Sequence, residues 1–196
     1  MKRTVLFALM VLTAAATATA QPLERCTMDD FSQIKKSVLT PGYDKAYGMV
    51  SNPSFDYMSS IMLYPDKREL VYRKAKDNFA AQSVEDGVPV ETSTLSITQE
   101  QNDLLSALFN AVVESARDKE QPKPGEIVAY GVDGETYTFF NGAKAGKCWS
   151  PPKDDIRGKL VNLMVEMSRY VRNHRPLSDQ LIEQAQELTS LFIDLQ

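Results

Sequence analysis

Cys148 and Trp149 are the first candidates for chemistry, because the sequence holds only one other cysteine, Cys26, and no other tryptophan. They lie side by side in the stretch NGAKAGKCWSPP. A cysteine nucleophile needs a base that generates the thiolate, and the single histidine, His174, is the natural candidate. The periodicity places His174 at the far end of a long helix, whereas the strand of Cys148 leads into its near end. We therefore expect a structural role for Cys148.

Residues 1–20 are typical of a secretory signal peptide. Lys2 and Arg3 give a positive start, and an apolar run over 5–12 is too short to span a bilayer. Ala18 and Ala20 then form a small-x-small cleavage site. The leader resembles those of exported bacterial proteins, so we expect a protein of the periplasm or the cell exterior that keeps no membrane anchor after cleavage.

Export changes the interpretation of the cysteines. In an oxidising compartment, two cysteines in one chain most simply form a disulfide. A Cys26–Cys148 bond would close a long loop and stabilise the fold by up to about 5 kcal/mol in the chain-entropy model. We therefore predict this disulfide.

Composition narrows the class of protein further. The 196-residue chain has a net charge of −4, which becomes −6 once Lys2 and Arg3 are removed with the leader. An acidic surface provides no electrostatic footprint for nucleic acid or anionic lipid. The remaining residues, 21–196, suit a single domain.

No catalytic or metal-binding motif is present. One histidine excludes an HExxH or three-histidine site, and the cysteines lack zinc-knuckle spacing. Phosphate-binding glycine motifs and serine-nucleophile motifs are also missing. We therefore expect no metal and no cofactor. The adjacent acids Asp29-Asp30, Glu85-Asp86 and Asp154-Asp155 are expected at turns or helix starts, and Glu114 and Glu166 on helix surfaces.

Periodicity and turn residues predict the elements that position these side chains. Helices are expected after Thr27, from Thr98 to about Arg117, from Ile156, and after Ser178. Strands are expected over 55–64, 69–76, 88–97, 126–131, 135–140 and 143–149, with tight turns at 65–68, 133–134 and 141–142.

This order predicts an α+β fold. We expect an antiparallel sheet of about six strands in two three-stranded groups, flanked by about four helices on one side. The recurrence of strands followed by a helix raises the hypothesis of a diverged duplication, with halves at 27–118 and 126–196.

Aromatic side chains concentrate in the predicted strands. If helices cover only one face of the sheet, some of these rings lie on the other face, where they could anchor a protein or glycan partner. The alternative is that they belong to the core. The candidate binding surface comprises Tyr57, Tyr72, Tyr130, Tyr137 and Trp149.

Three functional hypotheses follow. The first is a non-enzymatic binding or accessory module, which the missing catalytic motifs and the aromatic strands favour. The second is a small exported enzyme, which would use either Cys148 or a pair of carboxylates as a hydrolase. The third is a structural or inhibitory protein that presents a hairpin such as residues 132–135.

Overall fold

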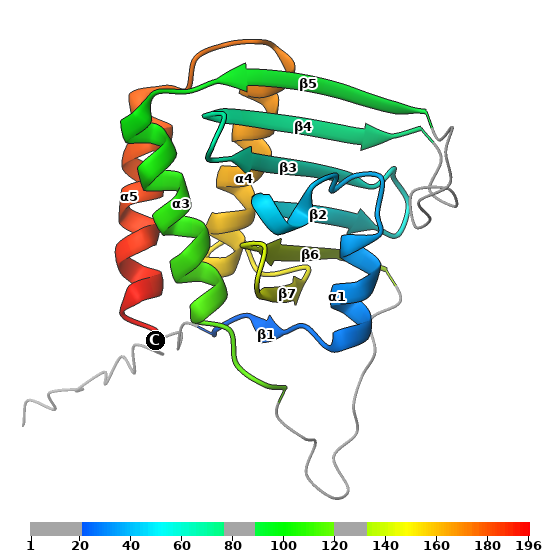
Figure 1. The fold of residues 1–196 in the computed structure, drawn as a ribbon. Coiled ribbons are helices and arrows are strands. Elements are labelled where there is room, and N and C mark those ends of the chain that lie inside the picture. Colours follow the sequence, from blue (N-terminus) through cyan, green and yellow to red (C-terminus); the bar gives the residue numbers. More distant parts are fainter. Residues whose placement is uncertain (1–20, 77–88, 120–132) are drawn as a thin grey trace, which may run out of the picture.

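The computed structural model describes residues 21–76, 89–119 and 133–196 (Figure 1). The described helices are α1 (Met28–Lys35), α3 (Gln99–Glu114), α4 (Ile156–Arg172) and α5 (Asp179–Ile193), with a short 3-10 helix, η1 (Tyr43–Lys45). The described strands are β1 (Glu24–Arg25), β2 (Tyr47–Pro53), β3 (Ser59–Tyr64), β4 (Glu69–Ala75), β5 (Val90–Ser96), β6 (Glu135–Phe140) and β7 (Ala145–Trp149). None of these helices has the length and apolar character needed to cross a bilayer.

The seven described strands form one antiparallel sheet in the order β1-β7-β6-β2-β3-β4-β5. Its centre is the pair of β2 and β6, which come from opposite halves of the chain and run side by side in Figure 1. The β6–β7 hairpin turns at Gly142, whose φ of +82° explains why glycine occupies that position.

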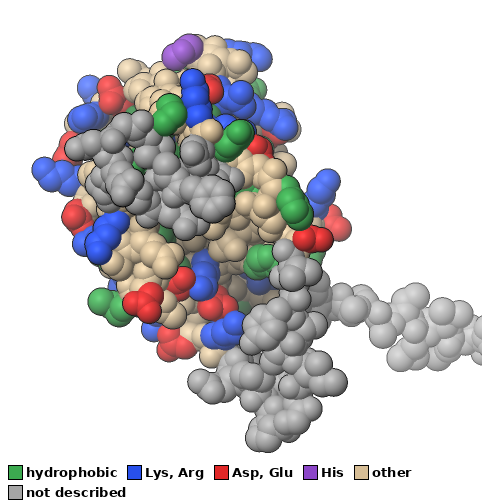
Figure 2. Space-filling view, turned by 90° about the vertical axis from the view of Figure 1, so that its right-hand side faces the viewer, with side chains coloured by type: hydrophobic (Ala, Val, Ile, Leu, Met, Phe, Trp, Pro, Cys, Tyr) green, Lys and Arg blue, Asp and Glu red, His purple; other side chains and the backbone are tan. Residues whose placement is uncertain are grey.

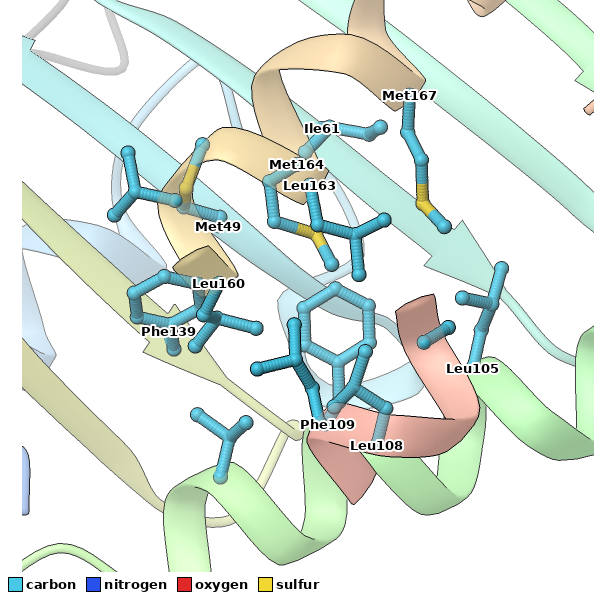
Figure 3. Close-up of a cluster of buried hydrophobic side chains, with 14 of the residues drawn as sticks. Met49, Ile61, Leu105, Leu108, Phe109, Phe139, Leu160, Leu163, Met164 and Met167 are labelled. Atoms are coloured by element: carbon cyan, nitrogen blue, oxygen red, sulfur yellow. The ribbon is translucent and has the colours of Figure 1, made fainter. Parts of the chain in front are cut away.

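Helices cover both faces of the sheet. The larger core lies between one face and α3, α4 and α5. In Figure 3, side chains such as Met49, Phe139, Phe109 and Leu163 converge from strands and helices into this core. A smaller core lies on the opposite face, where Phe31 and other residues of the α1 region pack.

The helix starts follow the predicted capping chemistry. The side chains of Thr27 and Thr98 each accept a hydrogen bond from the backbone amide of the third residue of the helix. In return, the backbone amides of Thr27 and Thr98 donate to the side-chain oxygens of Asp30 and Gln101. Ser178 caps α5. These caps satisfy backbone groups that would otherwise lack partners.

The structure confirms the predicted α+β class and antiparallel sheet, with differences in detail. The sheet has seven described strands in one continuous order, and α1 packs on the face opposite the other helices. The predicted strand over 55–64 begins only at Ser59, and β2 was not predicted. The predicted strand over 126–131 lies outside the described residues.

Candidate functional site

Cys26 and Cys148 are both free, so the predicted disulfide is wrong. The reason is the alternation of side chains along a strand. Cys148 on β7 points into the larger core, whereas Cys26, which follows β1, packs against the smaller core on the opposite face. The sheet therefore separates the two sulfur atoms.

His174 does not serve Cys148 either. Its Nδ1 lies 3.3 Å from the carbonyl oxygen of Thr94 on β5. Five strand spacings separate β7 from β5, which amounts to about 24 Å. Burial also raises the pKa of the Cys148 thiol to about 12, although nearby Arg157 opposes this shift. Cys148 is therefore a protonated thiol near neutral pH, without a histidine base.

One acid of each described pair, Asp30 and Asp155, has structural partners. Asp30 closes the cap of α1 and lies 2.8 Å from the Lys147 ammonium. Burial acts to raise the pKa of Asp30, but hydrogen bonds from Lys147 and Thr27 outweigh it, so the pKa lies below its ordinary value. Asp155 caps α4 and pairs with Arg157 at 2.7 Å.

The two helical acids, Glu114 and Glu166, pair with Lys144 and Arg169 at the surface, as expected for solvated side chains. Glu85-Asp86 lies outside the described residues. In residues 21–76, 89–119 and 133–196, no group of three His, Cys, Asp or Glu side chains could hold a metal ion.

A cavity of about 1000 Å³ lies where the ends of β2 and β6 meet α4 and α5. Its apolar wall includes Val161 and Leu188, which are buried, and Val165, which is half-buried. Asn162 and Gln184 add amide groups from the same two helices. We call this the α4–α5 cavity.

Two residues of the cavity lining, Glu135 and Tyr137, form a hydrogen-bonded cluster with the buried Ser51. One oxygen of the Glu135 carboxylate accepts a hydrogen bond from the Ser51 hydroxyl. The other accepts one from the Tyr137 hydroxyl at 2.6 Å. Burial, followed by this bond to Glu135, raises the pKa of Tyr137 above its ordinary value. Tyr137 therefore remains a proton donor to the carboxylate.

Strand register brings this cluster together. Ser51 is paired with Tyr137, and Pro53 with Glu135, so the three polar side chains share the face of the sheet that also carries Phe139. A backbone hydrogen bond also holds the start of β6: the Ser150 amide donates to the Glu135 carbonyl at 2.8 Å.

The first turn of α4 forms another wall. A Cβ atom on Gly158 would lie 2.0 Å from the carbonyl oxygen of Pro152, so only glycine allows this close approach. Asp155 accepts a hydrogen bond from the Arg157 amide at 2.7 Å, which fixes the helix start. These contacts place Lys153, Gly158 and Lys159 along the cavity.

One exposed aromatic side chain lines the cavity, and two others lie near residues of the lining. Phe55, in the loop between β2 and β3, lines it and is 85% exposed. Trp149 is 51% exposed and lies against Gly134, which is a residue of the cavity lining. The contact is close, since a Cβ atom added to Gly134 would lie only 2.4 Å from the indole ring. Tyr57 is 47% exposed and lies in the same loop as Phe55.

The predicted aromatic surface is thus distributed over several places. Tyr137 lines the cavity, and Tyr57 and Trp149 are exposed. Tyr72 is buried in the larger core, 5.4 Å from the Arg172 guanidinium, and Tyr130 lies outside the described residues. Ser51 and Glu135 were missed, although the alternation of Glu135, Tyr137 and Phe139 along one strand was a usable signal.

A second, smaller cavity of about 260 Å³ lies on the opposite face, beside α1. Its lining includes Asp30 and Lys147, whose charges are already paired with each other. The α4–α5 cavity is therefore the stronger candidate site.

Comparison with protein-family models, curated proteins and solved structures finds no match.

Proposed function

We propose that this chain is an exported binding or accessory module of the bacterial periplasm or cell exterior, and that its ligand occupies the α4–α5 cavity. One observation carries the proposal: a cavity of about 1000 Å³ combines apolar walls with the cluster around Glu135. Ligand sites in proteins are typically concave and mostly apolar, with a few convergent polar groups. We propose a peptide or a glycan as the partner.

The distribution of surface charge supports a peptide or a glycan as the partner, rather than nucleic acid or a membrane. Figure 2 shows Lys and Arg interspersed with Asp and Glu over the face it displays, with hydrophobic side chains in separate spots. Among the described residues on this face, the mixed charges form neither a basic groove nor a large apolar patch. Recognition would then depend on the cavity.

The only tryptophan offers a direct test of binding. Trp149 lies against Gly134 at the cavity, so ligand binding there should change its fluorescence. We propose to screen a library of small peptides and oligosaccharides by this signal and by thermal stabilisation. The control pair is Gln184→Tyr and Gln186→Tyr on α5, because Gln184 lines the cavity and Gln186 is exposed elsewhere on the helix.

The expected result is at least one ligand whose binding is weakened about tenfold or more by Gln184→Tyr and left unchanged by Gln186→Tyr. The proposal is rejected if no library member binds, or if both variants affect binding equally.

Export has a separate test. We propose to express the full 196-residue chain in a Gram-negative host and to measure the mass of the protein in each cell fraction. Loss of residues 1–20 from periplasmic protein is expected. An uncleaved cytoplasmic product would contradict it. Burial of both thiols is compatible with an oxidising compartment, since buried thiols are poorly reactive.

A carboxylate-based hydrolase is the second candidate, and Glu135 in the cavity is the observation that favours it. A carboxylate held by Ser51 and Tyr137 could act as a general base. Under this alternative, a ligand from the screen would be recovered chemically altered, and Glu135→Gln would stop the conversion. Recovery of unaltered ligand favours the binding module.

A further inference from the structure

Glu135 is the acidic member of the hydrogen-bonded cluster that it forms with Ser51 and Tyr137. Its side chain is half-buried on β6, and both of its partners, Ser51 and Tyr137, are neutral hydroxyls. None of the ion pairs among the described residues includes it. A carboxylate has about four acceptor positions, so two hydroxyls leave acceptor capacity on the cavity side.

The position of the charges along the cavity is uneven. Among the described residues of the lining, Glu135 is the half-buried charged side chain, whereas Lys153, Lys159 and Glu187 are exposed. Asp56, also exposed in the lining, is paired with Lys74 at 3.1 Å. A ligand that reaches the half-buried part of the lining therefore meets an acid that forms no ion pair with a described residue, while the exposed lining offers charges of both signs.

The walls between these charges are apolar and aromatic. Val161, Val165 and Leu188 provide aliphatic surface, and the Tyr137 ring lies beside the carboxylate that its hydroxyl contacts. Phe55 is an exposed residue of the lining. An aliphatic stem would bury apolar area along this wall, and aromatic faces attract cations as well as apolar groups.

We infer that the cavity binds a peptide segment through a lysine or arginine side chain, whose aliphatic stem lies along α4 and whose cationic head meets Glu135. This inference rests on the proposed binding function of the same cavity. A charge-assisted hydrogen bond to Glu135 supplies specificity for the cation, and the mixed charges of the exposed lining suit the polar backbone of a peptide. A neutral glycan would leave the Glu135 charge without a counterion.

The test compares peptides that differ only in this charge. The probes are acetyl-Ala-Arg-Ala-amide and its citrulline counterpart, acetyl-Ala-Lys-Ala-amide and its acetyllysine counterpart, and maltotriose as a neutral sugar. Binding is followed by Trp149 fluorescence and by calorimetry. Each cationic peptide is expected to bind at least about tenfold more tightly than its neutral counterpart.

Two variants assign the preference to Glu135. Glu135→Gln keeps the size of the side chain and removes its charge, and should bring each pair of peptides to within about twofold of each other. The matched control is Glu187→Gln, an exposed lining glutamate on α5, which should retain most of the preference. If Glu135→Gln fails to fold, Asn162→Lys at an exposed lining position of α4 should weaken the cationic peptides selectively.

The inference is overturned if citrulline and arginine peptides bind equally, if no cationic peptide binds, or if Glu187→Gln abolishes the preference as fully as Glu135→Gln. Binding of maltotriose or of the neutral peptides, weakened by Gln184→Tyr, would overturn the cation preference and leave the cavity as a ligand site. The two proposals therefore fail under different results.

Discussion

At the scale of single residues, burial governs the chemistry of both thiols. Cys26 lies beside the acidic side chain of Asp30, and Cys148 lies in the larger core. Burial is the main reason that the pKa of each thiol rises from 9.0 to about 12. The thiolate is the reactive species, so both cysteines are chemically quiet near neutral pH.

We predict that the native protein shows almost no reaction with a thiol reagent at pH 7.5, and that two thiols react after unfolding without reductant. The sheet separates the two sulfur atoms and burial keeps both protonated. A colorimetric thiol assay with and without denaturant measures this. Finding no thiol in the unfolded, unreduced protein would show that a disulfide had formed.

We also predict that the free energy of unfolding falls as pH rises above 9. The unfolded thiols lose their protons near 9.0, whereas the folded thiols keep theirs to about 12. The unfolded state therefore binds fewer protons in this window, and stability declines by about 1 kcal/mol per pH unit for each thiol. Urea unfolding from pH 7.5 to 10 tests this.

The control for this pH dependence is Cys148→Ala. This variant should be less stable at pH 7.5, because it leaves a small cavity, but its decline toward pH 10 should be shallower. An unchanged slope would mean that the thiol of Cys148 does not cause the decline.

At the scale of elements, the start of α4 shapes the cavity wall. Gly158 permits the helix to pass close to the carbonyl of Pro152, and Asp155 caps the same turn. The atoms that lie close to Gly158 belong to the backbone of Pro152 and Lys153, and backbone atoms cannot rotate away as a side chain does. This turn therefore has little tolerance for added volume.

We predict that Gly158→Ala destabilises the protein by about 2 kcal/mol, although alanine normally stabilises a helix relative to glycine by about 1 kcal/mol. The new methyl group would lie 2.0 Å from the Pro152 oxygen. Urea unfolding measures the loss. Lys159→Ala, at the next and exposed position, should change stability by less than about 0.5 kcal/mol. Equal stability of the two variants would contradict the close approach.

The sequence predicts the elements better than it predicts their neighbours. The bounds of β6 were predicted correctly at 135–140, and the caps at Thr27, Thr98 and Ser178 were recognised, because those signals are local. β2 was missed because Gly48 and the polar end Ser51-Asn52 hide a strand that is buried on both faces.

The site followed the same pattern. Tyr137 was among the predicted binding residues. Ser51, which is paired with Tyr137 across the sheet and donates to the same Glu135 carboxylate, lies on the unpredicted β2. The face on which each cysteine lies also depends on strand pairing between distant segments, so the mistaken disulfide could not be avoided from spacing alone.

At the scale of the whole molecule, the two halves of the chain are joined through the centre of the sheet. β2 from the first half pairs with β6 from the second, and Met49 and Phe139 face each other there in the larger core. The helices α3 and α5, which come from segments far apart in the sequence, pack on each other over this core. Neither half retains a complete core without the other.

We therefore predict a single cooperative unfolding transition. Trp149 fluorescence reports the end of β7, and far-UV circular dichroism reports mainly the helices, so their urea midpoints should coincide. Phe139→Leu, in the shared core, should lower both midpoints together, with a loss of about 1 kcal/mol or more. Separate midpoints, or a shift of only one signal, would mean that strands and helices unfold independently, which a core shared across β2 and β6 does not permit.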